Sequence, residues 1–191
     1  MENYIKNYIK NSILAKEQIL SDADLLSLIE KTANLIVEAY NSGKKVLTAG
    51  NGGSAGDAQH IAAELVSKFM LDRPALNAIA LTTNSSILTA VGNDYSAEYI
   101  FSRQIQAYGN SGDIFIAIST SGNSLNIINA IKEAKNRGMV VIGLVGSKKS
   151  KMDNLCDILL RVPSEQTPII QESHIMMGHI ICALAEKELF V

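Results

Sequence analysis

Residues 45–65 read KVLTAGNGGSAGDAQHIAAEL, an apolar run followed by a small polar loop and a segment with helical spacing. Residues 113–134, DIFIAISTSGNSLNIINAIKEA, follow the same order. Strands that alternate with helices in this way predict a parallel sheet covered by helices on both faces. In such a sheet the loops after the strands lie at one edge, where ligands bind. We therefore expect the two polar loops on the same edge of the molecule.

The rest of the chain continues this alternation. Apolar runs predict five strands, at residues 45–49, 77–81, 113–118, 140–145 and 158–162. Helical periodicity predicts helices at residues 3–20, 22–41, 54–69, 124–137 and 165–189, the last with Ile170, Met177, Ile181 and Leu184 facing the core. The sequence thus predicts one α/β domain over residues 1–191. It is a three-layer sandwich with a five-stranded parallel, Rossmann-like sheet, preceded by N-terminal helices in residues 1–42.

Composition limits the classes of function. The chain has 191 residues, 47% of them hydrophobic and 19% charged, which is a globular balance. Its net charge of −2 gives no electrostatic reason to bind nucleic acid or an anionic membrane, and the one basic cluster, residues 148–151, is interpreted as a solvated loop. Two cysteines argue against a disulfide framework, and neither a signal peptide nor a membrane span is recognised. We expect a soluble, cytoplasmic protein.

The glycine loop matches two nucleotide motifs poorly. Residues 50–55, GNGGSA, satisfy the dinucleotide pattern G-x-G-x-x-A, but that reading needs an acidic residue near the end of the second strand. Here Thr-Thr-Asn-Ser-Ser follows that strand at residues 82–86, and Asp72 precedes it. A P-loop is excluded because the loop lacks the lysine that reaches a terminal phosphate.

The second loop suits a single phosphate group. Residues 119–124, STSGNS, place four hydroxyls and a glycine between an apolar strand and the start of a helix. Unpaired backbone N–H groups and the helix dipole favour an anion there. The alternative is an ordinary helix cap by Ser124 or Asn123, but one cap needs only one such residue. We favour phosphate, with Asn51 to Ser54 of the glycine loop as a second polar surface for the hydroxyls of a phosphorylated sugar.

The remaining candidate residues are the three histidines and two polar residues on the same helices. His60 and Glu64 are four residues apart and share one helix face. Gln171 and His179 lie about 80° apart around the C-terminal helix and can also share a face, whereas His174 is interpreted as structural. The residues His60, Glu64, Gln171 and His179 could bind Zn²⁺ through mixed nitrogen and oxygen ligands. They could equally supply a carboxylate base and an imidazole acid.

These motifs together resemble a known family. The sequence STSGNS after a strand, GNGGS before a helix with His60 and Glu64, VGND at 91–94, FSRQI at 101–105, and Gln171 with His179 are similar to the phosphoheptose isomerases, which are built on the sugar isomerase (SIS) domain. The resemblance runs through nearly the whole chain. It implies conversion of sedoheptulose 7-phosphate to D-glycero-D-manno-heptose 7-phosphate, the first step toward nucleotide-activated heptose for lipopolysaccharide or capsule. It also implies a homotetramer with active sites between subunits.

The resemblance implies a role for each matching residue. Ser119, Thr120, Ser121 and Ser124 would hold the phosphate, and Asn51, Gly52, Gly53, Ser54, Asn93, Asp94, Glu64 and Gln171 would complete the substrate site. Glu64 would be the base of an enediol mechanism and His179 the acid. One Zn²⁺ per subunit would be held by His60, Glu64, Gln171 and His179.

Other SIS proteins remain as alternatives. Non-catalytic members, such as sugar-phosphate-sensing regulators and replication-initiator-associating proteins, need the phosphate loop but not the proton-transfer residues. No DNA-binding helix-turn-helix is recognised in this sequence. Among enzymes, another phosphosugar aldose–ketose isomerase is the nearest competitor.

Overall fold

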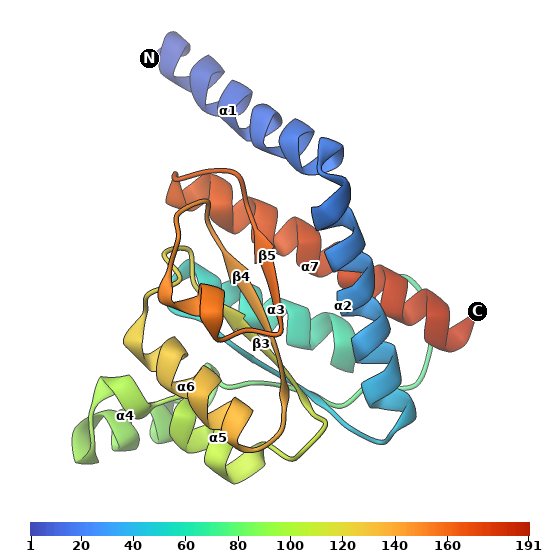
Figure 1. Cartoon of the computed structure of the whole chain (residues 1–191), viewed down its shortest axis with the longest axis vertical. Helices are drawn as coiled ribbons and strands as arrows, with labels where there is room; N and C mark the ends of the chain where they lie inside the picture. Colours follow the sequence, from blue (N-terminus) through green and yellow to red (C-terminus); the bar gives the residue numbers. More distant parts are fainter.

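The computed structural model describes residues 1–191, in which helices and strands alternate as the sequence predicts (Figure 1). The strands are β1 (Val46–Ala49), β2 (Ala78–Ala80), β3 (Ile114–Ile118), β4 (Val140–Val145) and β5 (Ile158–Arg161). The helices are α1 (Glu2–Ser21), α2 (Ala23–Asn41), α3 (Gly53–Val66), α4 (Ser85–Asp94), α5 (Ser102–Tyr108), α6 (Leu125–Asn136) and α7 (Thr167–Phe190), with short 3₁₀ turns η1 (Ala97–Tyr99) and η2 (Lys151–Asn154).

The five strands form one parallel sheet in the order β2-β1-β3-β4-β5. Each strand falls inside one of the five predicted apolar runs, so the predicted fold class is confirmed. The chain moves outward from β1 to β2 and then returns to β3 on the other side of β1. A ligand crevice is expected where the direction reverses in this way, at the carboxyl ends of the strands.

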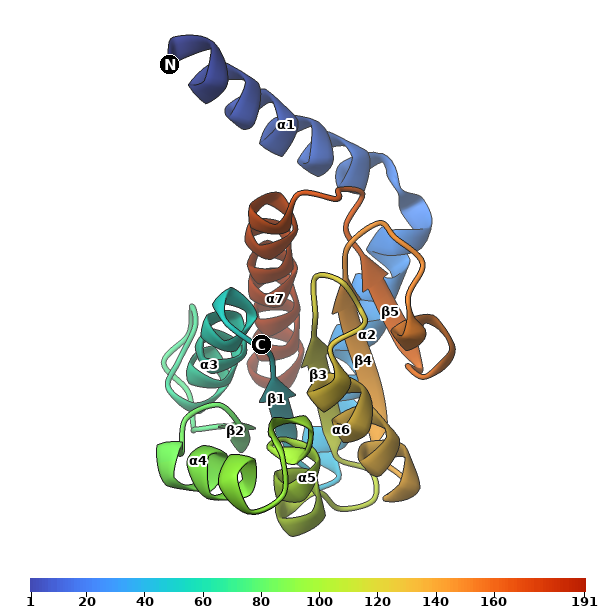
Figure 2. The same cartoon turned by 90° about the vertical axis from the view of Figure 1, so that its left-hand side faces the viewer.

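Helices cover both faces of the sheet (Figure 2). Ile114, Ile116 and Ile118 of β3 pack in a buried cluster with α2, α3 and α7. Phe115 and Ala117 point to the opposite face and join a second cluster with α5 and α6. Successive side chains of a strand point to opposite faces, so a strand buried on both sides is apolar throughout. This explains why β3 reads as an unbroken apolar run.

The first helix stands away from this body (Figure 1). Only Ala15 and Ile19 of α1 are buried, both near its carboxyl end. Asp22 separates α1 from α2, and its carboxylate accepts a hydrogen bond from the Leu25 N–H at 2.9 Å, as an N-cap does.

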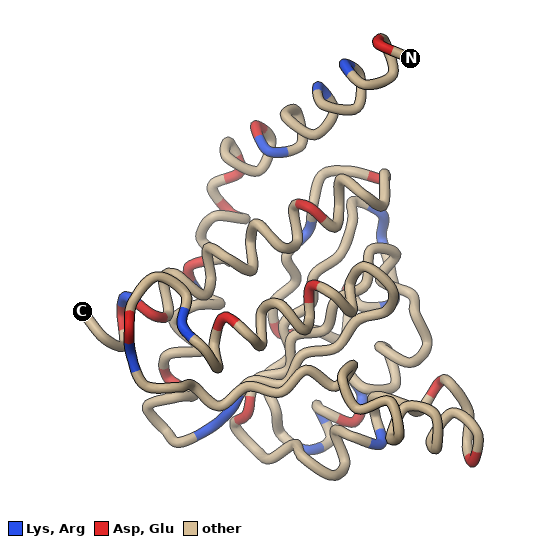
Figure 3. Tube along the Cα trace, turned by 180° about the vertical axis from the view of Figure 1, so that it is seen from behind, with Lys and Arg blue, Asp and Glu red and all other residues tan.

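None of the helices is long and apolar enough to cross a membrane. Positive and negative residues are interspersed along the trace (Figure 3).

Three details differ from the sequence prediction. Helices α4 and α5 were not predicted, and α3 ends at Val66 instead of continuing to residue 69. Ile170, Met177 and Ile181 are buried as expected, but Leu184 is 37% exposed. The next two residues of α7, Ala185 and Glu186, are buried, so Leu184 lies on the side of the helix that faces away from the core.

Candidate active site at the carboxyl edge of the sheet

The two polar loops meet at one edge of the sheet, as predicted. Asn51 follows β1 and Asn126 lies in the first turn of α6. Their side-chain amides exchange two hydrogen bonds, each 2.9 Å long. This reciprocal pair fixes the glycine loop against the start of α6 and makes the two loops parts of one surface.

The hydroxyl-rich loop leaves donors free at the start of α6. Ser124 is the N-cap residue, but its hydroxyl caps no helix N–H and lies 3.1 Å from the Ser119 hydroxyl instead. Gly122 has a φ of +63°, and a Cβ there would overlap the Ser150 side chain. Glycine is therefore required for this turn. This arrangement, which we call the anion cradle, suits an anion at a helix N-terminus better than an ordinary cap.

The glycine loop approaches α7 closely. A Cβ at Gly53 would lie 2.5 Å from Nε2 and 2.8 Å from Oε1 of Gln171, well inside ordinary contact distance. The Gln171 amide therefore rests directly on the first residue of α3. Gly52, with a φ of +55°, provides the left-handed turn that precedes this contact.

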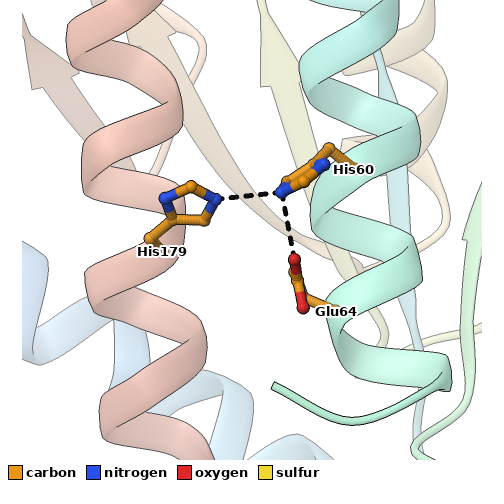
Figure 4. A group of neighbouring side chains, drawn as sticks. All are labelled: His60, Glu64 and His179. Carbon is orange, nitrogen blue, oxygen red and sulfur yellow. Dashed lines mark hydrogen bonds and ion pairs between the residues drawn. The ribbon is translucent and has the colours of Figure 1, made fainter. Parts of the chain in front are cut away.

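Three of the four predicted metal ligands converge between α3 and α7 (Figure 4). His60 Nε2 lies 3.0 Å from His179 Nε2 and 3.0 Å from Glu64 Oε1. All three ligand atoms lie within 4.8 Å of one another. We call His60, Glu64 and His179 the triad. The side chain of His60 is 50% exposed and that of Glu64 20% exposed, so a small molecule can reach them.

The triad has the donor set and nearly the spacing of a zinc site. In a tetrahedral site with bonds of about 2.0–2.1 Å, neighbouring ligand atoms lie roughly 3.3 Å apart. His60 Nε2 carries either one proton or one lone pair, so it cannot make a full hydrogen bond to both His179 Nε2 and Glu64 Oε1, whereas one cation can accept a lone pair from all three atoms. The residues present therefore fit zinc. Gln171, the fourth predicted ligand, is not part of this group in the structure. It lies eight residues before His179, which is about 12 Å along the helix axis, and its amide contacts Gly53.

The remaining predicted residues are placed differently. Asn93 and Asp94 lie in the last turn of α4, where both are exposed and the Asn93 amide donates to Asp94 Oδ1 at 2.9 Å. No hydrogen bond joins either side chain to the loops or the triad. His174 is fully buried, in agreement with a structural role.

Asp57, which the sequence analysis did not single out, lies close to His60 of the triad. It lies one turn before His60 on α3, and its Oδ2 is buried without a hydrogen-bond partner. Burial raises the pKa of Asp57 to about 6, although the nearby His60 lowers it. Its spacing of three residues from His60 was the available signal, because such residues share a helix face.

A cavity of about 260 Å³ opens beside the hydroxyl-rich loop. Thr120, Ser121 and Asn123 line one side of it. Lys148 and Lys149, interpreted from sequence as part of a solvated loop, line the same cavity. Lys148 pairs with Glu165 at 3.1 Å, whereas Lys149 has no ion pair. The basic cluster thus supplies a free cation next to the anion cradle.

Two polar loops joined at the carboxyl edge of the sheet and a His–Glu–His group between α3 and α7 fit a protein that acts on a sugar phosphate, and the family comparison identifies the class. The model of the SIS domain matches residues 7–146. The phosphoheptose isomerase of Aneurinibacillus thermoaerophilus is 58% identical over 100% of this chain and 96% of its own length. That of Clostridium acetobutylicum is 56% identical over 100% and 97%. The solved phosphoheptose isomerase of Francisella tularensis superposes with a TM-score of 0.93 at 39% identity, covering 97% of each chain.

The chain therefore belongs to the phosphoheptose isomerases of the SIS-domain family, which confirms the resemblance seen in its motifs. It is an enzyme, a sugar-phosphate isomerase.

Proposed function

We propose that this enzyme converts sedoheptulose 7-phosphate to D-glycero-D-manno-heptose 7-phosphate through an enediol, as the first step toward nucleotide-activated heptose for surface polysaccharide. The observation that carries the proposal is the convergence of His60, Glu64 and His179 from two helices, in a chain more than half identical to named phosphoheptose isomerases. A ligand-binding SIS protein needs the phosphate loop but has no use for a base and an acid placed together.

The phosphate end of the substrate sets its orientation. Hydroxyls of Ser119, Thr120, Ser121 and Ser124 and the first N–H groups of α6 bind the phosphate oxygens. Asn51 to Ser54 and the Gln171 amide contact the sugar, and we keep Asn93 and Asp94 in this substrate-binding group. Holding the sugar at both ends limits its motion relative to the triad, which lowers the entropic part of the barrier.

Proton transfer is assigned to Glu64 and His179. Glu64 removes the proton from C1 of the ketose while His179 donates a proton to the oxygen on C2, which gives the enediol. Removal of the proton from the oxygen on C1 and return of a proton to C2 then give the aldose. Oε1 of Glu64 faces His60, so we propose that the other carboxylate oxygen, Oε2, removes the carbon-bound proton.

Zinc fits the same residues. His60, Glu64 and His179 would hold it, with Gln171 proposed as the fourth ligand. When bound, zinc supplies a Lewis acid for the carbonyl oxygen. A bound cation would also stabilise the ionised carboxylate of Glu64 and occupy the Nε2 lone pair of His179. The base function then depends on the Glu64 oxygen that is not a ligand, and the acid function on the His179 ring nitrogen that is not a ligand.

We further propose that the chain forms a single SIS domain, with residues 1–42 as N-terminal helices, and that four copies assemble with active sites between subunits. Tyr4, Ile5, Ile9 and Ile13 on α1 are 75%, 57%, 51% and 50% exposed, so their side chains are largely uncovered within the chain. An apolar stripe of this kind marks a protein interface.

The first test is NMR of the purified enzyme with sedoheptulose 7-phosphate in D₂O, before and after chelation and zinc restoration. Appearance of the aldose establishes the reaction, and loss on chelation with rescue by zinc establishes the metal. An unchanged ketose with a shifted phosphate signal would make the chain a sugar-phosphate binder instead.

Two variants test the assigned roles. We expect Glu64→Gln to remove nearly all turnover and His179→Gln most of it, while the phosphate signal still reports binding. Glu188→Gln, which removes an exposed carboxylate from α7, is the control for loss of one negative charge outside the triad. Near-wild-type rates in either of the first two variants would overturn the assignment.

A further inference from the structure

A buried carboxylate holds the segment that follows α3 onto α7. Glu186 of α7 has a side chain that is 1% exposed. It accepts the backbone N–H groups of Phe69, Met70 and Leu71 at 3.0, 2.7 and 2.9 Å, and the Arg73 Nε at 3.0 Å. Burial alone raises the pKa of a carboxyl group, but these four donors hold the pKa of Glu186 below its usual range. Glu186 is therefore an ionised anchor for residues 69–73.

Its partner, Arg73, is equally buried, with a side chain that is 2% exposed. Nη2 donates to the Glu64 carbonyl at 2.7 Å, and Nη1 donates to the carbonyls of Leu65 and Ser67 at 2.7 and 3.1 Å. Carbonyls at the end of a helix have no partner within it, so Arg73 satisfies those that α3 leaves open. Helix α3 can therefore end at Val66 without leaving these carbonyls unpaired.

We call the Arg73–Glu186 pair the clamp, and each of its two residues is linked to the triad. The carbonyl that accepts from Nη2 belongs to Glu64, which is itself a member of the triad. The ring of Phe69, whose N–H is held by Glu186, stacks on the His179 ring with centroids 5.6 Å apart and planes 24° apart. The clamp thus contacts the backbone of one triad residue and, through Phe69, the side chain of another.

We propose that the Arg73–Glu186 pair is a positioning element of the triad: it fixes the end of α3 and the Phe69 ring against α7, and so sets the spacing of the ligand atoms of Glu64 and His179. The proposal rests on the metal site of the proposed function. A buried ion pair is often no more stabilising than apolar residues of the same volume, which leaves positioning as the role that needs charge and fixed geometry. Residues that orient metal ligands change metal affinity by about 10–100-fold when they are replaced.

The test compares two variants of the clamp with a matched control. Glu186→Gln keeps the shape of the side chain but removes the negative charge that faces Arg73. Phe69→Leu removes the aromatic ring that stacks on His179. Asp113→Asn is the control, because Asp113 is also a 1% exposed carboxylate, paired with Lys45 at 2.6 Å and bonded to the backbone N–H groups of Lys45 and Asn110. It lies just before β3, at the amino edge of the sheet, and its hydrogen bonds join neither the triad nor residues 69–73.

Two measurements on the full-length protein separate positioning from stability. The first is Co²⁺ affinity of the metal-free protein, followed by visible absorption and by competition with a chelator. We expect a 10–100-fold weaker Kd for Glu186→Gln and for Phe69→Leu, and a change below about threefold for Asp113→Asn, even if its Tm falls as far. Unchanged Co²⁺ affinity in both clamp variants would reduce the pair to a structural role.

The second measurement does not depend on metal. In the metal-free protein the Phe69 ring should shield the ring protons of His179, and this NMR shift should collapse in Glu186→Gln but persist in Asp113→Asn. If the wild-type protein binds no Co²⁺, the zinc assignment fails while this shift still decides whether the clamp orients His179. A shift that persists in Glu186→Gln would overturn the proposal. If Glu186→Gln does not fold, Arg73→Lys, which keeps the charge but not the fork of donors, takes its place in both measurements.

Discussion

Substitution of Gly53 by alanine should inactivate the enzyme without unfolding it. The added Cβ would lie 2.5 Å from Gln171 Nε2, whereas ordinary contact begins at 3.4 Å, so the amide must retreat by about 0.9 Å. The clash involves the flexible end of a side chain and not backbone, so the fold can absorb it. Alanine also favours a helix over glycine by roughly 0.5–1 kcal/mol, which offsets part of the strain.

The expected loss is in catalysis. A misplacement of about 1 Å in a substrate-positioning group can cost 10²-fold, so kcat/KM for sedoheptulose 7-phosphate should fall about 100-fold, or about 2.7 kcal/mol of transition-state stabilisation. The assay is steady-state isomerisation, with Tm measured on the same samples. Gly56→Ala is the matched control, because Gly56 lies on the same helix and an added Cβ there meets nothing within 4 Å.

Gly56→Ala should keep wild-type kcat/KM and raise Tm by roughly 1–4 °C, since 1 kcal/mol corresponds to about 2–4 °C in a chain of this size. Gly53→Ala should leave Tm within a few degrees of wild type. If the kcat/KM of Gly53→Ala stays within threefold of that of Gly56→Ala, the position of the Gln171 amide does not matter for turnover and the reasoning is wrong.

Three further predictions concern other parts of the chain. Burial lowers the pKa of His174 to about 4 despite an opposing interaction with the Val145 backbone. The unfolded chain therefore binds a proton below about pH 6.5 that the native chain excludes. The free energy of unfolding should fall by up to about 3 kcal/mol as pH drops from 6.5 to 4. In urea unfolding, the free energy of His174→Gln should depend less on pH than that of the wild type, and an equal pH dependence would contradict this. Ile9→Asp on the exposed stripe of α1 should reduce the assembly mass in light scattering while the far-UV CD spectrum is retained, and an unchanged mass would exclude α1 from the interface. Lys149→Ala should raise KM with little change in kcat, because it removes the free cation of the cavity beside the phosphate loop; an unchanged KM would place that lysine outside the substrate site.

Much of the fold could be predicted because its signals are local. Each strand is an apolar run, and β3 and β4 are apolar throughout because both of their faces are covered. The polar loops after β1 and β3 had to share an edge once the sheet was parallel, and the bonds between Asn51 and Asn126 join them there. Helices α4 and α5 were missed because they are only 10 and 7 residues long, too short for a clear period.

The candidate site also has a part that could be predicted from local spacing and a part that could not. The spacing of His60 and Glu64 was enough to put them on one helix face, because four residues make about one turn. The meeting of His179 with them could not be read from spacing, because its position depends on how α7 packs beside α3, with Gly178 against Ile61. The Arg73–Glu186 clamp joins residues 113 positions apart and left no periodic pattern to read. Contacts within one helix follow from the geometry of the chain, whereas contacts between helices depend on the packing of the whole core.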